Sequence, residues 1–357
     1  MSSLRVGLLG AGDVAERHVR GLLSAGSVAL VAVYDPATGR AETLGGRLGF
    51  ERTAADARQV IDADDVDLVL VLTPHHLHAE QSMAALRAGK HVICEKPMAC
   101  RVEECDAMLE CAAACGRRLF VSHALRCDFF FRVALERLRE GALGRLTLGS
   151  IRWFTDEFAR LETPGHWKGT TERSGGGVLI DGGCHVADLA NALFGRPLRV
   201  HAMGGLLVAS REGLGEDTAV FSVEFASGAV CSFALSFVAG SAMREERFAC
   251  GMDVDLYGTE AHLGGGYRIR DDVVRRYARE HRQGEPERIH VDDGRTEAGE
   301  VDARIVEALR TGEEPPVTAL EARNALAVVE AAYRSLRSGA AEDVDWRQSS
   351  VATDRGD

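Results

Sequence analysis

Three side chains of this chain could supply acid–base chemistry, and the first is a lysine in a sequence that hardly uses lysine. Among 42 basic residues, the only lysines are Lys90, Lys96 and Lys168. Arginine can replace a lysine that merely carries surface charge, but only the compact ammonium of lysine has a pKa that shifts readily. Lys96 lies in Glu95-Lys96-Pro97, directly after a strand-like run at residues 91–94, where α/β proteins keep their ligands. A functional ammonium and a solvated turn lysine both fit this position.

The other two side chains are a carboxylate and an imidazole, four residues apart. Asp181 and His185 follow the glycine run Gly175–Gly177 and open an apolar segment that we expect to be helical. Residues four apart share one face of a helix, and a carboxylate beside an imidazole raises its pKa and orients it for general acid–base catalysis. An ordinary surface Asp–His pair has the same spacing, so both interpretations stay open here.

The N-terminal residues have the pattern of a nucleotide-binding turn. Residues 4–9 form a mostly apolar run, which is typical of a strand buried on both faces. They lead into Gly10-Ala11-Gly12-Asp13-Val14-Ala15, a G-x-G-x-x-A motif that precedes a helix. Gly10 permits the tight turn, and Gly12 lets backbone N–H groups approach a pyrophosphate, an anion that the helix N-terminus favours.

A second strand, at residues 29–34, ends in Asp35. An acidic side chain about twenty residues beyond such glycines accepts hydrogen bonds from an adenosine ribose and repels a 2′-phosphate. We therefore expect NAD rather than NADP as the cofactor, although Arg40 is near enough to leave NADP open. Asp35 also precedes Pro36, and an Asp-Pro step that starts a turn is the plain alternative.

Strands and helices continue to alternate through the first third of the chain. Strand-like runs at 66–72, 91–94 and 118–122 are separated by helical segments at 79–88 and 102–115. This alternation predicts βαβ units and a doubly wound parallel sheet of the Rossmann type.

Three histidines, His75, His76 and His78, follow Thr73-Pro74 at the end of the third expected strand. Their spacing is not that of a helical zinc site, and no nearby carboxylate or thiolate completes a ligand set, so we expect no metal. We expect one imidazole either to touch the cofactor or to cap the next helix.

Composition narrows the class of protein. A length of 357 residues suggests two domains. The net charge of −12, without a basic stripe, argues against a nucleic-acid partner. Nine cysteines without a C-x-x-C pair argue against a disulfide framework and a zinc knuckle. Because we find no signal-peptide layout and no apolar run of ~18 residues, we expect a cytoplasmic protein without a membrane partner.

After residue 122 the pattern changes to consecutive strands, which implies an antiparallel or mixed sheet. We expect strands at 146–152, 198–203, 218–225, 230–237 and 248–257, and helices at 131–140 and 320–336. The charged stretch 270–295 has the composition of a loop. The predicted organisation is a dinucleotide-binding domain at 1–122, a substrate-binding and oligomerisation domain at 123–340, and a polar tail at 341–357.

In this order, the Gly10–Ala15 turn, Glu95-Lys96-Pro97 and the segment 175–185 resemble the Gfo/Idh/MocA family of pyridine-nucleotide oxidoreductases, and the resemblance extends over nearly the whole chain. It implies a Rossmann domain followed by an α/β domain with a large open sheet, which commonly builds homodimers or homotetramers. It also implies an active site at the domain junction, where a nicotinamide faces the lysine, the carboxylate and the imidazole, with a sugar, amino sugar or cyclitol as substrate.

This resemblance suggests a mechanism and a set of contacts. His185 accepts the proton of a secondary hydroxyl as the carbinol hydride passes to the nicotinamide. Asp181 holds the imidazole and favours its protonated form, and Lys96 stabilises charge on the hydroxyl oxygen. The expected cofactor contacts are Gly10, Gly12, Asp13, Val14, Asp35, Arg40, Thr73, Pro74, His75, His78, Glu95 and Lys96. The expected substrate contacts are Lys96, Arg126, Trp153, Trp167, Asp181 and His185.

The chain departs from the family pattern at two places, and two other functions stay open as alternatives. His75 stands where the family often has asparagine, and the run Cys127–Phe131 stands where a proline is usual, so the identity of the substrate is open. An NAD-dependent glycosidase could use the same scaffold, but such relatives often have a tyrosine near the acid–base position. A non-catalytic nucleotide-sensing regulator would need neither Lys96 nor His185.

Overall fold

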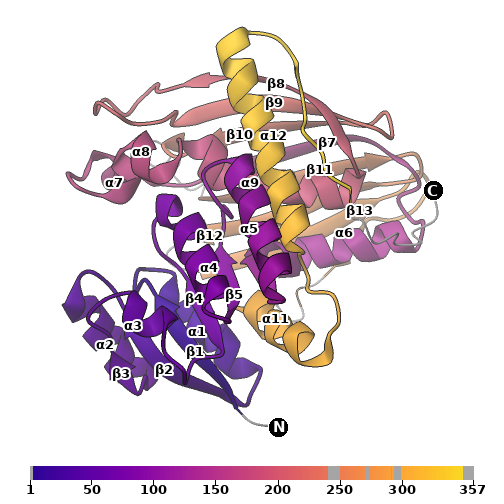
Figure 1. Cartoon of the computed structure of the whole chain (residues 1–357). Coiled ribbons are helices and arrows are strands. Elements are labelled where there is room, and N and C mark those ends of the chain that lie inside the picture. Colours follow the sequence, from indigo (N-terminus) through magenta and orange to yellow (C-terminus); the bar gives the residue numbers. More distant parts are fainter. Residues whose placement is uncertain (1–2, 240–249, 271–272, 291, 293–298, 349–357) are drawn as a thin grey trace.

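The computed structural model describes residues 3–239, 250–270, 273–290, 292 and 299–348, and most of them belong to two sheets and the helices around them (Figure 1). The first sheet is parallel, with strand order β3-β2-β1-β4-β5-β6. Its strands are β1 (Leu4–Leu9), β2 (Val28–Tyr34), β3 (Arg52–Thr53), β4 (Leu68–Val71), β5 (His91–Glu95) and β6 (Leu119–Ser122). The direction of winding reverses between β1 and β4, and the expected Rossmann arrangement is confirmed.

Helices cover both faces of this sheet because its strands are apolar on both sides. The neighbours Leu8 and Leu9 of β1, for example, belong to two different hydrophobic clusters. The connections contain α1 (Ala15–Ser24), α2 (Thr38–Leu48), α3 (Arg58–Ile61), η1 (His75–Leu77), α4 (His78–Arg87) and α5 (Val102–Cys115). Because the strands are parallel, the carboxyl ends of β1, β4 and β5 meet at one edge, which carries Gly10, Thr73 and Lys96.

The second sheet is mixed, with strand order β14-β13-β12-β11-β7-β10-β9-β8-β15. β7 and β10 are parallel, and the other neighbours are antiparallel. The strands are β7 (Leu146–Phe154), β8 (Pro197–Gly205), β9 (Thr218–Phe225), β10 (Val230–Ser236), β11 (Cys250–Gly258), β12 (His262–Arg270), β13 (Val273–His281), β14 (Arg288–His290) and β15 (Glu342–Asp343).

One face of the second sheet packs against three long helices (Figure 1). They are α6 (Phe129–Arg139), α9 (Val178–Phe194) and α12 (Ala319–Ser338). Side chains along the strands alternate between the buried and the exposed face, as Phe221 and Ser222 do on β9. In the core, the rings of Phe221 and Phe233 stack with centroids 4.4 Å apart. Between β7 and α9 the chain forms α7 (Phe158–Glu162), η3 (Trp167–Gly169) and α8 (Thr171–Ser174).

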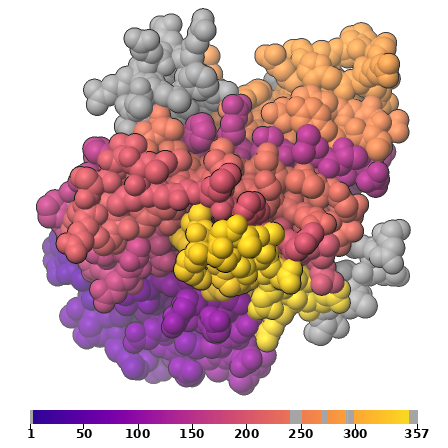
Figure 2. Space-filling model, turned by 90° about the horizontal axis from the view of Figure 1, so that it is seen from above, coloured from indigo at the N-terminus to yellow at the C-terminus, as the bar shows by residue number. Residues whose placement is uncertain are grey.

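Two helices from the C-terminal part of the chain pack against helices of the first sheet. They connect the part of the chain around the first sheet with the part around the second. In the space-filling view, yellow residues of α12 lie between salmon-coloured strands and the purple first domain (Figure 2). α11 (Glu300–Thr311) packs on α1 so closely that a Cβ at Gly21 would lie 2.2 Å from the carbonyl oxygen of Gly299. The buried Arg323 of α12 pairs with Asp106 of α5, Nε to Oδ1 at 2.9 Å.

A buried imidazole between two carboxylates joins α1, α11 and β5. His18 lies with Nδ1 3.0 Å from Asp302 Oδ2 and Nε2 3.2 Å from Glu95 Oε1. Burial alone would lower the pKa of His18, but the two carboxylates outweigh it and raise the pKa to about 9. His18 is therefore a cation at neutral pH. It contacts Glu95, the residue that precedes Lys96.

The structure corrects one expectation about the second half of the chain and shows elements there that were not expected. Much of the stretch expected to be a loop at 270–295 forms β13 and β14, because its charged side chains pair with other elements, as Glu280 does with Arg137 at 2.7 Å. β12 and α11 were not expected. Part of the expected polar tail packs on the second domain, since β15 pairs with β8 and Asn324 donates to the carbonyl of Arg347. Residues 248 and 249 of an expected strand lie outside the described residues.

The expected domain boundary follows β6, which ends at Ser122, and we retain it as a proposal. Among the described residues, no helix is both long and apolar enough to span a bilayer. In that same part of the chain, we find no group of three or more histidine, cysteine or acidic side chains arranged to hold a metal.

Stability should depend on the charge of His18. Its folded pKa exceeds the ordinary value of 6.5, so its contribution is complete below that pH and is lost as the pH rises through about 9. We expect His18→Gln to lower the free energy of unfolding by about 2 kcal/mol at pH 7, and the gap to the wild type to shrink towards pH 9.5. Urea unfolding at each pH measures this gap.

Leu22→Ala on the same helix is the matched control, because it deletes buried apolar volume. Its deficit should stay constant over this pH range. A His18→Gln deficit that is equally constant would contradict the ionic role of His18.

Candidate active site

Lys96 leaves the carboxyl end of β5 and reaches the second domain. Its Nζ donates to Asp181 Oδ1 at 2.6 Å and to the Asp181 carbonyl at 3.1 Å. Its backbone N–H donates to Glu95, the carboxylate that also contacts His18. Burial alone would lower the pKa of Lys96, but the carboxylates of Asp181 and Glu95 together outweigh this effect and raise the pKa above its ordinary value. Lys96 is therefore an ammonium, and it contacts Asp181, a meeting that the family resemblance implied.

A second lysine occupies the other oxygen of the same carboxylate. Lys168 Nζ lies 2.7 Å from Asp181 Oδ2 and 3.3 Å from Glu157 Oε2. Burial alone would raise the pKa of Asp181, but Lys168 and Lys96 together hold it well below its usual range. Sequence reasoning missed Lys168 as a site residue, although the scarcity of lysine singled it out as clearly as Lys96.

The glycine run before Asp181 serves close packing of the protein against itself. A Cβ at Gly177 would lie 1.9 Å from the carbonyl oxygen of Glu216, and one at Gly176 would lie 2.0 Å from Tyr333 Oη. Glu216 also accepts from the Leu179 amide at 2.8 Å. These contacts fix the start of α9 and so place Asp181 in its first turn.

His185 does not pair with Asp181, contrary to the expectation from their spacing. Its Nδ1 is buried without a hydrogen-bond partner within the described part of the chain, while the residue as a whole stays partly exposed. Its ring lies beside His123 and Trp153, with centroids 6.0 and 6.4 Å away. Burial, reinforced by the charge of Lys96, lowers the pKa of His185 well below its usual value. The imidazole is therefore neutral, and the carboxylate that was expected to favour its protonated form is engaged by the two ammoniums.

Two expected substrate contacts lie in the packed interior instead. Arg126 forms a two-pronged ion pair with Asp188, at 2.7 Å from Nε and 2.8 Å from Nη2, and its side chain is 8% exposed. Trp153 packs against Gly182, and its Nε1 lies 3.3 Å from Tyr267 Oη. Since their polar atoms already have partners, we do not assign either side chain to substrate binding.

The expected cofactor histidines are held by backbone carbonyls. His78 has Nδ1 2.8 Å from the Pro97 oxygen and Nε2 2.7 Å from the Thr73 oxygen, so neither nitrogen is left for a cofactor. His75 contacts the Ser174 oxygen at 2.7 Å, and burial lowers its pKa to about 3. Its ring meets Trp167 edge-on, with centroids 4.5 Å apart. Trp167, which is half-buried, thus borders the domain junction.

The residues around the first turn fit a dinucleotide. Gly10 has a φ of +94°, and a Cβ there would lie 2.5 Å from the Leu72 oxygen. A Cβ at Gly12 would meet nothing within 4 Å, so the surface above it is open. Asp35 is held by the amides of Ala11 and Ala37, at 2.9 and 2.8 Å, at the end of β2. This arrangement leaves lone pairs on its carboxylate for a ribose.

Of the other expected cofactor residues, Thr73 and Glu95 are hydrogen-bonded to protein groups. Pro74 follows β4 at the sheet edge, Thr73 donates its hydroxyl to Gln81 at 2.7 Å, and Arg40 is exposed on α2. Glu95 is buried behind Lys96, with its carboxylate engaged by protein groups, so it positions the lysine and has no free oxygen directed at a cofactor.

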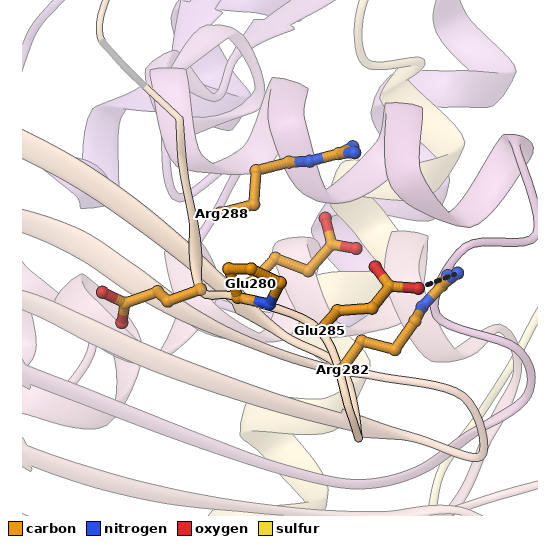
Figure 3. A pocket seen from close by; sticks show the side chains of 6 residues that line it. Glu280, Arg282, Glu285 and Arg288 are labelled. Atoms are coloured by element: carbon orange, nitrogen blue, oxygen red, sulfur yellow. Dashed lines mark ion pairs between the residues drawn. The ribbon is translucent and has the colours of Figure 1, made fainter.

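A surface hollow of about 310 Å³ lies elsewhere, in the β13–β14 hairpin (Figure 3). Its charged side chains face one another, as Arg282 and Glu285 do at 3.8 Å. Glu280, which also lines it, is already paired with Arg137. Because these charges pair among themselves and with the sheet, we assign no function to the hollow.

Known proteins match this chain over both domains. The model of an oxidoreductase family with an NAD-binding Rossmann fold matches residues 4–123, and the model of the Gfo/Idh/MocA C-terminal domain matches residues 131–263. The chain is 31% identical to a 1,5-anhydro-D-fructose reductase of Ensifer adhaerens over 265 residues, which are 73% of this chain and 75% of that protein. It is 29% identical to a levoglucosan dehydrogenase of Pseudarthrobacter phenanthrenivorans, over 76% of each chain.

Solved structures agree with this assignment at the level of the fold. A levoglucosan dehydrogenase in complex with NADH superposes with a TM-score of 0.82, at 24% identity, over 97% of this chain and 100% of that chain. With both family models matched in order, and a relative above 30% identity covered over three quarters of its length, the chain belongs to the Gfo/Idh/MocA family of NAD-binding oxidoreductases.

Proposed function

We propose that this protein transfers a hydride between NAD and a secondary alcohol, or the matching ketone, of a sugar, amino sugar or cyclitol. The observation that carries the proposal is the meeting of Lys96, Asp181 and Lys168, with His185 one helical turn away, at the carboxyl edge of the Rossmann strands. That edge is where folds of this type bind nucleotides. When bound, the nicotinamide accepts or returns the hydride.

His185 is the proposed proton acceptor. A base must be unprotonated before it can take the proton of a hydroxyl, and the lowered pKa of His185 keeps the imidazole neutral at pH 7. Lys96 lowers this pKa further by its charge, so the neutral base and the ammonium favour each other. Since Asp181 is engaged by the two lysines and the His185 residue is partly exposed, the imidazole can bond a substrate.

Lys96 is the proposed electrostatic partner of the reacting oxygen. Its ammonium has three N–H donors, and the structure assigns two hydrogen bonds to Asp181. A donor therefore remains for a substrate hydroxyl, where it would stabilise negative charge that develops on oxygen. Asp181 orients this ammonium, and Lys168 on the opposite oxygen keeps the carboxylate ionised and in place.

Within the proposed class of substrates, the balance of charge favours an uncharged sugar or cyclitol. Among the described residues, the cations Lys96 and Lys168 are matched by Asp181 and Glu157. The Arg126 guanidinium is neutralised by Asp188. Relatives named for anhydrofructose, levoglucosan and inositol point to the same class of substrate.

We also propose that the partner of the second sheet's outer face is another copy of this chain, in a homodimer or homotetramer. Tyr257, Leu148 and Val230 are neighbours in register on adjacent strands, and all three are 40% exposed or more. A contiguous apolar row of this kind on a sheet surface is typical of a contact between proteins. A cytoplasmic setting, which we propose as well, agrees with the free thiols of the described cysteines.

The proposed activity predicts the outcome of a substrate screen. We expect at least one sugar, cyclitol or amino sugar to change the nicotinamide absorbance, with NAD used more efficiently than NADP because Asp35 opposes a 2′-phosphate. Release of an aglycone without a net absorbance change would assign the chain to the glycosidases instead. Tight NADH binding without turnover of any polyol would favour a regulator.

His185→Ala should separate binding from chemistry. With the substrate found in the screen, we expect turnover to fall by about 10²- to 10⁴-fold. The dissociation constant for NADH, measured by fluorescence titration, should change less than twofold. His76→Ala removes an exposed imidazole nearby and should keep its turnover. Wild-type turnover in His185→Ala would remove this residue from the mechanism.

Lys168→Met should disturb Asp181 without touching the proposed base. Because the carboxylate loses one of two ammoniums, its pKa should rise, and the acidic limb of the kcat profile should move to higher pH. We expect turnover to fall about tenfold or more. Lys168→Arg restores a cation and should recover part of the activity. An unshifted pH profile in Lys168→Met would show that Lys168 has only a packing role.

A further inference from the structure

The second domain reaches the glycine turn of the first domain through Arg160. This side chain belongs to α7, and its Nη2 lies 2.8 Å from Oδ2 of Asp13, between Gly12 and the start of α1. Its Nη1 is 3.2 Å from both carboxylate oxygens of Glu157. A guanidinium from the substrate-binding side therefore stands beside the turn that faces the cofactor.

Asp13 is a weak partner for this guanidinium. Its side chain is 78% exposed and that of Arg160 is 46% exposed, and an ion pair so open to water contributes little and is screened by salt. Replacing Asp13 by an anion that binds Arg160 more strongly therefore costs little free energy. Arginine is also the side chain whose planar fork of N–H donors matches a phosphate best.

The turn that contains Asp13 also has backbone N–H groups without hydrogen-bond acceptors in the described part of the chain. Within the described part of the chain, the N–H groups of residues 12–14 have no hydrogen-bond acceptor, whereas Gly10 donates to the Tyr34 carbonyl at 2.8 Å and Ala15 to the Gly12 carbonyl at 3.0 Å. α1 has ten residues, and its N-terminus favours an anion. Free amides, a helix N-terminus and an exchangeable guanidinium thus surround one site, which carries the exposed carboxylate of Asp13.

We propose that Arg160 binds the pyrophosphate of the cofactor, leaving Asp13 when the dinucleotide is bound. This inference rests on the NAD-linked function proposed above. It makes Arg160 a cofactor ligand contributed by the substrate-binding domain, and it gives Asp13 the role of holding the guanidinium at the turn until the phosphates replace it.

The proposed ligand is connected to the catalytic carboxylate by consecutive ion pairs. Glu157 contacts Arg160 on one side and Lys168 on the other, and Lys168 contacts Asp181. When Arg160 turns to the pyrophosphate, Glu157 keeps Lys168 as its cationic partner. The pyrophosphate site and the substrate site therefore share one charged segment, from residue 157 to residue 168.

The test compares ligands with and without the pyrophosphate. Isothermal titration of the full chain with NADH, ADP-ribose and adenosine gives three dissociation constants for each variant. Arg160→Ala should weaken NADH and ADP-ribose about tenfold and adenosine less than twofold. Asp13→Ala should keep or tighten both pyrophosphate ligands, because it removes a like charge and releases Arg160. Arg173→Ala removes an exposed cation of the same region and should leave all three constants within twofold.

Two results would overturn the proposal. Equal weakening of NADH by Arg160→Ala and Asp13→Ala would mean that the two residues form only an ion pair between domains. Unchanged binding of ADP-ribose by Arg160→Ala would mean that the guanidinium does not reach the phosphates. Wild-type protein that binds neither NADH nor ADP-ribose would overturn the proposed function as well, whereas loss confined to the variant leaves that function intact.

Discussion

The carboxylate of Asp181, buried between two ammoniums, is the interaction on which the rest of this molecule depends. Taking three charges out of water is unfavourable unless they compensate one another. The compensation needs Lys96 from the Rossmann sheet, and Lys168 and Asp181 from the second domain, so the site exists only while the two domains are docked. Docking and acid–base chemistry are thus parts of one electrostatic arrangement.

A second charged centre supports the first from behind. Glu95 contacts cationic His18 with its side chain, and its neighbour Lys96 faces Asp181, so β5 ends between two buried ionic groups. His18 in turn holds Asp302 of α11. Two separate segments of the second half of the chain, α9 and α11, therefore converge on the same strand end, one from the substrate side and one from the side of α1.

Local sequence patterns predicted helices and strands well where the residues of the element itself determine its structure. The helix at 102–115 and the strand at 218–225 have the expected bounds, and the family resemblance implied the meeting of Lys96 with Asp181. The spacing of Asp181 and His185 permits contact, but Lys168, thirteen residues earlier, competes for the carboxylate with a full charge. The partners of Arg126 and of β13 are likewise set by distant segments, which a local pattern cannot reveal.

The placement of the lysines has a consequence for how this protein can be labelled. Lys90 is 8% exposed and donates to the Ala63 carbonyl at 2.6 Å, and the side chains of Lys96 and Lys168 are 13% and 14% exposed. These are all the lysines of the chain. Amine-directed dyes and resins thus have little ε-amine to react with on the folded surface. Labelling through amines would therefore spare the two ammoniums of the active centre.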